Sequence, residues 1–243
     1  MQPPSLVPDR YRVLSGSALK VLAVISMLAD HTAKRILAHY PWFVEPLYRL
    51  GSTDVSWYVL AESFGRLAFP IFCFLLVEGF VYTRDRRRYG INLLIFALVS
   101  EPIFDLSRKL TLVDPTYQNV FFTLFVSYVG LCALEGLRNR PALRACAVIG
   151  LALVSMGMLC DYGARGYAMV LMLYALRDRP LEKTALGSCI TLSTWRAGLA
   201  FIPINLYNGR RGFIKGPVLK YVFYAFYPLH LFVLWRLRVY LGF

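Results

Sequence analysis

The side chains best suited to chemistry in this sequence are ionisable residues that interrupt long apolar runs. The run from residue 17 to 39 carries Asp30 and His31 near its middle. An ionisable side chain at the centre of a membrane helix costs about 2.5–3.5 kcal/mol, so such residues face a bundle interior and often mark a site. An imidazole titrates at about pH 6.5 and can take a proton at neutral pH. His31 is therefore the first candidate base, against the plainer alternative of a structurally satisfied histidine.

Asp30 is the candidate residue that supports His31, although adjacent residues on a helix point about 100° apart. The carboxylate therefore does not face the imidazole by default. Two cations are candidate partners for it: Lys34, one helical turn along, and Arg66, which comes from a different apolar run. Arg66 could equally bind an anion or anchor its helix at the membrane interface.

Further polar candidates lie deeper in the chain. Glu78 is either a ligand-binding residue or the partner of a neighbouring arginine. Glu101 precedes a proline within an apolar run, whereas Asp105 and Arg108 on the same face suggest a local ion pair. Asn119 opens the next run, where it would cap a helix or touch a ligand.

The last apolar run adds Tyr227 and His230, which are three residues apart and can share a helical face. Tyr227 could line a site or belong to an interfacial aromatic belt. His230 is placed more deeply and is a candidate site residue.

The elements that must position these residues are membrane helices. Hydrophobic residues make up 58% of the 243 residues and charged residues only 17%, against about 25% in soluble domains. A span needs about 20 residues, so the chain has room for roughly eight. We predict an all-α integral membrane protein, a polytopic bundle of about 8–9 transmembrane helices in a single domain, 1–243. The predicted spans are 17–39, 66–83, 91–109, 119–137, 145–160, 166–176 and 218–241.

The stretch 184–207 leaves two alternatives open, a single span or two short broken helices that meet near Trp195 and Arg196. A single span would put the basic residues 210–215 outside the cell, against the positive-inside rule. A broken pair would put them inside, but each piece is too short to cross alone. The charge rule favours the broken pair.

The net charge of +13 is concentrated in short loops, at 84–88, 138–144 and 210–211. Apolar runs of membrane length separate these clusters, which excludes a soluble nucleic-acid-binding protein and places the loops and the N-terminus in the cytoplasm. None of the five cysteines shows metal-ligand spacing, so they are predicted to be small core residues and no metal site is expected.

Four motifs together resemble the TraX family of pilin N-acetylase-like membrane proteins. They are Asp30-His31, the segment 65–72 (GRLAFPIF), Asp161-Tyr162-Gly163 and the segment 226–231 (FYPLHL), in that order along nearly the whole chain.

The resemblance implies a bacterial inner-membrane acetyltransferase related to membrane acyltransferases. Its co-substrate would be cytoplasmic acetyl-CoA, and its acceptor an amine such as a pilin N-terminus, another peptide or a small molecule. It also implies that His31 is catalytic, that Asp30 supports it, and that Arg66 and His230 line the site. The remaining candidates are predicted to bind substrate as well: Glu78, Glu101, Asn119, Asp161, Tyr162 and Tyr227.

The chemistry fits these residue types, because a histidine can deprotonate an amine or carry the acetyl group itself. Arg66, Tyr227 and His230 are candidate donors to the oxyanion. Two other functions remain open: a small proton-coupled transporter that uses the intramembrane acidic residues and histidines, and a non-enzymatic assembly protein whose buried charges are structural.

Overall fold

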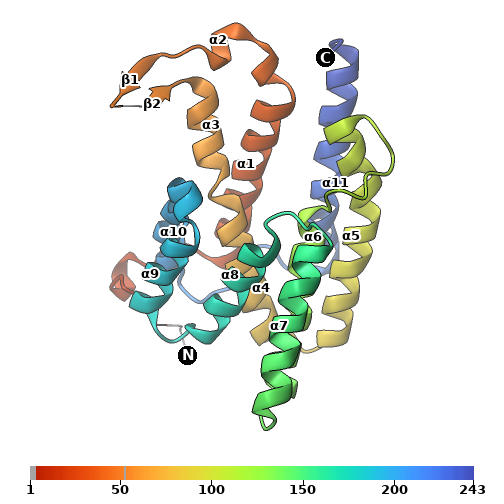
Figure 1. Ribbon diagram of the computed structural model, residues 1–243. Coiled ribbons are helices and arrows are strands. Elements are labelled where there is room, and N and C mark those ends of the chain that lie inside the picture. The colour runs from red at the N-terminus through yellow and green to blue at the C-terminus, as the bar shows by residue number, and fades with distance from the viewer. Residues whose placement is uncertain (1–3, 52) are drawn as a thin grey trace.

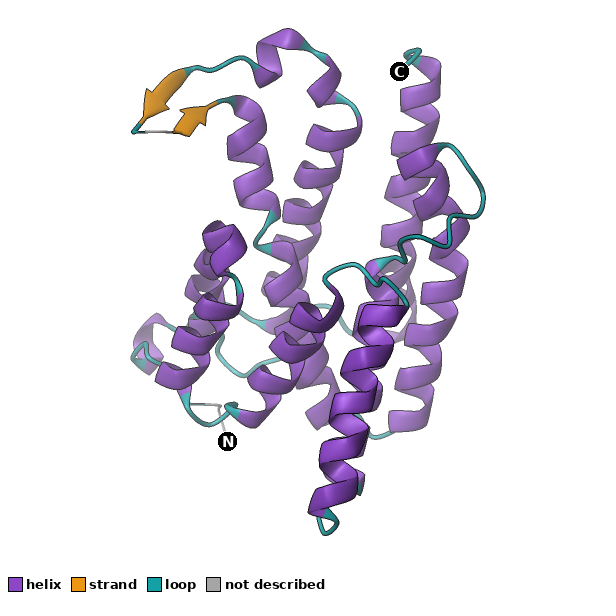
Figure 2. Ribbon diagram, viewed as in Figure 1, coloured by secondary structure: helices purple, strands orange, loops and turns teal. Residues whose placement is uncertain are grey.

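The computed structural model describes residues 4–51 and 53–243, and almost all of its regular structure is helical. Figure 1 and Figure 2 show helices lying side by side, with a short β-hairpin projecting at the end opposite the N-terminus. The elements in chain order are η1 (Asp9–Tyr11), α1 (Gly16–Arg35), η2 (Leu37–His39), α2 (Pro41–Val44), β1 (Tyr48–Leu50), β2 (Thr53–Val55), α3 (Trp57–Gly65), α4 (Ala68–Tyr82), α5 (Arg86–Lys109), α6 (Val120–Gly136), α7 (Pro141–Gly157), α8 (Gly163–Ala175), α9 (Pro180–Ile190), η3 (Leu192–Ala200), α10 (Phe201–Asn205) and α11 (Gly216–Tyr240).

Several helices are long and apolar enough to cross a bilayer. They are Trp57–Tyr82, Arg86–Lys109 and Val218–Tyr240, with two shorter apolar helices at Val120–Gly136 and Pro141–Gly157. Large apolar side chains on the outer faces of α7 and α11 are exposed, among them Ile149, Leu153, Leu229 and Val233. Exposed apolar surface of this extent suits contact with lipid better than contact with water. The mostly helical, membrane-type architecture agrees with the sequence.

The second predicted span starts earlier than expected. The aromatic segment before Arg66 forms α3, which is capped by the hydroxyl of Ser56 and ends at Gly65. Arg66 and Leu67 form a turn, after which α4 continues the same path to Tyr82. Arg66 therefore lies at a break inside the span and not at its mouth.

The ambiguous stretch 184–207 is broken, as the charge rule favours. α9 ends at Ile190 and the chain returns through η3 and α10, with Phe201 packed against Gly187 of α9. The basic segment that follows then meets the start of α1, because Gly16 N–H donates to the Arg210 carbonyl over 2.8 Å. The break falls at Thr191 and not near Arg196, since 3-10 turns continue through that region. The side chain of Trp195, at the predicted junction, lies outside the described part.

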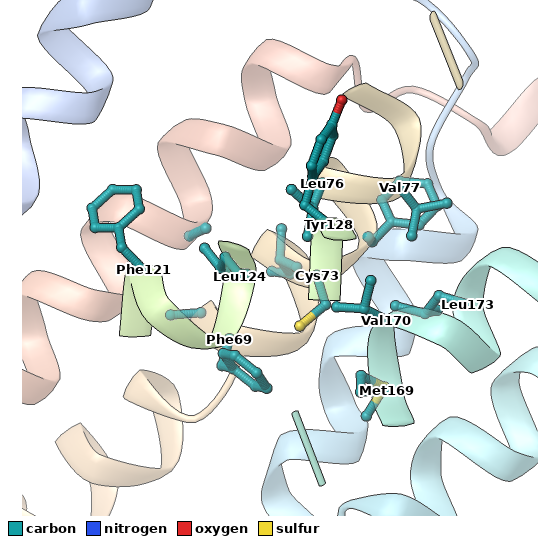
Figure 3. Close-up of a cluster of buried hydrophobic side chains, with 14 of the residues drawn as sticks. Phe69, Cys73, Leu76, Val77, Phe121, Leu124, Tyr128, Met169, Val170 and Leu173 are labelled. Atoms are coloured by element: carbon teal, nitrogen blue, oxygen red, sulfur yellow. The ribbon is translucent and has the colours of Figure 1, made fainter. Parts of the chain in front are cut away.

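A core of apolar side chains joins α4, α6 and α8 (Figure 3). Cys73 of α4 is fully buried among Leu124 of α6 and Val170 of α8, and it is a free cysteine, as expected for a small core residue. This core fixes α4 as the central element against which the site-bearing helices pack.

Candidate functional site

Two histidines that are 199 positions apart in the sequence meet between α1 and α11. The Nδ1 of His31 lies 2.7 Å from the Nε2 of His230, and the two rings are nearly parallel, at 6°, with centroids 5.0 Å apart. α1 begins with a cap from Ser15 and carries His31 in its last third, while α11 carries His230 at a similar height. The two strongest candidates from sequence are thus direct partners.

The hydrogen bonds define which nitrogen of each ring carries a proton. The Nδ1 of His230 lies 2.8 Å from the carbonyl of Phe226, and a carbonyl can only accept, so this nitrogen donates. In the neutral ring Nε2 is then an acceptor, and it must receive the hydrogen from Nδ1 of His31. The remaining lone pair is on Nε2 of His31. Both nitrogens of His230 are thus engaged, one with the Phe226 carbonyl and one with His31.

Tyr227 completes this group from one turn below His230. Its ring meets His31 edge-on at 6.3 Å and His230 at 5.7 Å, and the residue is buried. Tyr227 is therefore a core residue of the site and not part of an interfacial belt.

Asp30 faces Lys34 and does not touch the His31 ring by any hydrogen bond within the described residues. Its Oδ2 accepts from Nζ of Lys34 over 2.8 Å, whereas Oδ1 is buried without a partner. α3 approaches closely here, and a Cβ added to Gly65 would collide with the Asp30 side chain. Of the two predicted partners, the structure selects Lys34.

Arg66 pairs with Glu62, one turn earlier in α3, over 2.7 Å. Lys34 lies 3.9 Å from the same carboxylate, so the charges alternate from Asp30 through Lys34 and Glu62 to Arg66. Glu62 was missed in the sequence, although its position four residues before an arginine is a recognisable ion-pair signal.

Glu101 and Asn119 bind one another. The backbone N–H of Asn119 donates to Glu101 over 3.0 Å, and the Asn119 amide donates to the same carboxylate. Asn119 also accepts from the N–H of Phe121, so its predicted role as a helix cap is confirmed. The other oxygen of Glu101 is buried without a partner among the described residues.

The Asp161-Tyr162-Gly163 turn lies beside this pair. The backbone of Asp161 donates to the Gln118 carbonyl over 2.8 Å, and its side chain accepts from the Tyr117 hydroxyl over 2.7 Å. Tyr162 stacks on Phe69 with ring centroids 3.6 Å apart. The turn therefore joins the wall of the site to the central helix α4.

Glu78 lies in the next-to-last turn of α4 and pairs with Arg177 over 3.2 Å, which confirms the predicted alternative of an arginine partner. One expectation requires correction. Asp105 and Arg108 do not pair with one another: Arg108 binds Asp114 over 2.6 Å, and Asp105 accepts the backbone N–H of Asp114. The loop after α5 folds back, a contact that helical spacing cannot reveal.

Among the residues described, no group of three or more His, Cys, Asp or Glu side chains is arranged to hold a metal ion. The arrangement offers a lone pair on a partly buried imidazole, two buried carboxylate oxygens without hydrogen-bond partners among the described residues, and a surrounding aromatic wall. These groups suit proton transfer or acyl transfer to a nucleophile.

Comparison with known proteins identifies a relative and a protein family. The chain is 26% identical to a protein of Dichelobacter nodosus described as "Probable fimbrial assembly protein FimC, serogroup H1", over 93% of this chain and 97% of that protein. No solved structure matches the chain. The family model described as TraX protein matches residues 15–238, and the chain therefore belongs to the TraX family.

Proposed function

We propose that this protein is a membrane acetyltransferase that moves an acetyl group from cytoplasmic acetyl-CoA to an amine. The observation that carries the proposal is the hydrogen-bonded series from the Phe226 carbonyl through His230 to His31. It leaves a lone pair on the partly buried imidazole of His31, which a base or an acyl-accepting nucleophile requires.

In direct transfer, the amine nitrogen attacks the thioester carbonyl while Nε2 of His31 takes the amine proton. The tetrahedral intermediate then expels the coenzyme A thiolate, which receives the proton from His31. His230 keeps the imidazolium oriented, because Nδ1–H of His31 donates to it throughout. In the alternative route, Nε2 attacks the thioester and the coenzyme A thiolate leaves. The amine then displaces the imidazole from the acetyl group, and its proton passes to the thiolate.

The developing oxyanion needs donors close to His31. With both nitrogens of His230 engaged, Tyr227 and Arg66 remain as the candidates from this chain. Arg66 is held by Glu62, so its reorientation towards substrate would break a partly exposed ion pair, an interaction of about 0–1 kcal/mol.

The protein would lie in the bacterial inner membrane as a bundle of about eight to nine helical segments, related to membrane acyltransferases. The N-terminus and the basic loops occupy one end of the molecule (Figure 1), and the positive-inside rule makes that end cytoplasmic. His31 is 15 residues into α1, about 22 Å from this end. Acetyl-CoA would reach it from the cytoplasm, and the acceptor from the opposite, nearer face.

The acceptor class follows from the family and the relative. The name of the relative from Dichelobacter nodosus links that protein to fimbrial assembly. A protein N-terminus, such as that of a pilin, is therefore the first acceptor to test, ahead of other peptides and small amines. The proposed reaction involves no nucleic acid.

The test is transfer of labelled acetyl from acetyl-CoA to a panel of peptides and small amines, with purified protein in lipid nanodiscs. His31→Ala should lower turnover by about 10²–10⁴-fold, the usual contribution of a general base. His39→Ala is the matched control, since this third histidine is exposed and stacks on Phe243. Wild-type turnover in His31→Ala would refute the assignment.

The second candidate is a proton-coupled transporter. Asp30 and Glu101 each have a buried oxygen without a hydrogen-bond partner in the described part of the chain, and this favours a transporter because intramembrane carboxylates are common in proton relays. Substrate uptake into liposomes in response to a pH gradient, without acetyl turnover, would select this function over the first.

A further inference from the structure

A short segment between α1 and α3 exposes a large aromatic and apolar surface. It comprises α2 and the hairpin of β1 and β2, at the end of the molecule opposite the N-terminus (Figure 1). We name it the outer segment, residues 41–51 and 53–57. Trp42, Tyr48, Leu50 and Trp57 are 58%, 54%, 69% and 50% exposed. Large apolar side chains gathered in this way mark an interaction surface, because soluble proteins rarely leave contiguous apolar patches in water.

The hairpin within this segment is amphipathic. Side chains alternate between the two faces of a strand, and those of directly paired residues share a face. Tyr48 pairs with Val55, so these two residues and Leu50 form one apolar face. Arg49 and Asp54 pair on the other face, where their side chains form an ion pair over 3.5 Å. A two-stranded hairpin is at best marginally stable alone in water, so a partner is expected to cover its apolar face.

The length of the adjoining span places this hairpin at a defined depth in a bilayer. Together α3 and α4 run from Trp57 to Tyr82 over 26 residues, about 38 Å at 1.5 Å per residue. An average tilt of about 20° shortens this to about 35 Å along the bilayer normal. The basic cluster 84–88 follows Tyr82 directly and belongs at the membrane surface. Since the hydrocarbon layer is about 30 Å thick and the whole bilayer about 40–45 Å, Trp57 lies in the headgroup layer of the opposite leaflet.

The helix on the other side of the outer segment gives the same depth. α1 runs from Gly16 to Arg35, about 29 Å, and Gly16 is hydrogen-bonded to the basic segment at Arg210. The chain therefore leaves the hydrocarbon layer near Arg35 and enters α2 at headgroup level. The buried ring of Phe43 in α2 meets Tyr58 of α3 edge-on, with centroids 6.4 Å apart, so the two ends are held together. Figure 1 shows the hairpin extending sideways from them, across the helix axes, as an element along a bilayer surface would.

We propose that the outer segment is an interfacial anchor in the headgroup layer of the leaflet opposite the basic loops. The face of Tyr48 and Leu50 is turned towards the acyl chains, and the ion pair of Arg49 and Asp54 faces water. Tryptophan and tyrosine favour this layer, because each joins an apolar ring to a polar N–H or O–H group. The occupant is lipid and not a peptide or a second copy of the chain, because both adjoining helices deliver the segment to this depth.

Quenching of tryptophan fluorescence tests the depth in nanodiscs that hold one protein molecule each. The chain has four tryptophans, so the difference between wild type and Trp42→Phe isolates Trp42, and Trp57→Phe gives a second, independent probe. Lipid brominated near its headgroup should quench both signals about twofold or more beyond lipid brominated at the bilayer centre, which is about 15 Å deeper. Aqueous iodide should quench them little. Quenching by iodide alone would place the segment in water, and protection from all three quenchers would mean that protein covers it; either result would overturn the inference.

Hydrogen exchange in the same nanodiscs tests which face of the hairpin meets lipid. The amide of Leu47 donates to the Val55 carbonyl over 2.8 Å and reports opening of the hairpin. Leu50→Thr keeps a high strand propensity but removes apolar burial, so it should lower the protection of this amide by about tenfold. Arg49→Gln is the matched control on the opposite face, since Arg49 is as exposed as Leu50, and it should stay within about threefold of wild type. Equal protection in Leu50→Thr and wild type would overturn the inference, and neither measurement depends on acetyl turnover.

Discussion

Replacement of His230 by alanine tests whether the pair of histidines works as a unit. The change removes the acceptor for Nδ1–H of His31, which is 2.7 Å away, and the anchor on the Phe226 carbonyl. His31 would keep its place on α1 but lose the contact that fixes its tautomer and ring orientation. The expected result is a protein that folds and binds acetyl-CoA but turns over slowly.

The magnitude follows from the lost hydrogen bond. A buried donor left without its acceptor costs about 1–3 kcal/mol, or roughly 5- to 150-fold in rate if the whole cost falls on the transition state. This loss is smaller than that of His31→Ala, which removes the base itself. In His230→Gln the side-chain oxygen can occupy the position of Nε2 and accept from His31, so this variant should recover most of the lost activity.

The assay is the initial rate of labelled acetyl transfer in nanodiscs, measured for wild type, both single variants and the double variant. Because the two residues act together, the double variant should be no slower than His31→Ala alone. His39→Ala again serves as the control. Wild-type turnover in His230→Ala, or strictly additive losses in the double variant, would refute this account of the histidine pair.

Three further predictions concern the supporting structure. Gly65→Val should lower thermal stability by about 1–3 kcal/mol, because the added side chain collides with Asp30. Gly136→Val should lower stability less, because a Cβ added there meets no neighbour. Equal melting temperatures for the two variants would contradict this prediction. Asn119→Leu removes the cap of α6 and should lower the melting temperature by the equivalent of about 1–2 kcal/mol. Hydrogen bonds from Lys109 hold the pKa of the Asp114 carboxyl well below its usual range, so its contribution to stability persists above about pH 4 and is lost as the pH falls further. The melting temperature, measured between about pH 3 and 7, should fall at acidic pH in the wild type and fall less in Asp114→Asn. Identical pH profiles for the two proteins would contradict this prediction.

Local features of the site could be predicted where the physical cause is also local. Asn119 before an apolar run predicts a cap, and the structure has it. Lys34 four residues after Asp30 predicts an ion pair, and the structure has that as well. The same rule failed for Asp105, because the loop after α5 returns and supplies Asp114 as a partner, a contact set by the path of the chain.

The sequence by itself determined the membrane-type helical fold, since apolar runs of spanning length have few other solutions. It also determined the type of residue at the site, because buried ionisable side chains are rare and conspicuous in such runs. Only the tertiary structure decided that His31 and His230 share a hydrogen bond and that Arg177 is the partner of Glu78. Helical periodicity relates residues within a turn or two, whereas the relative height and rotation of two packed helices depend on side chains along their whole length.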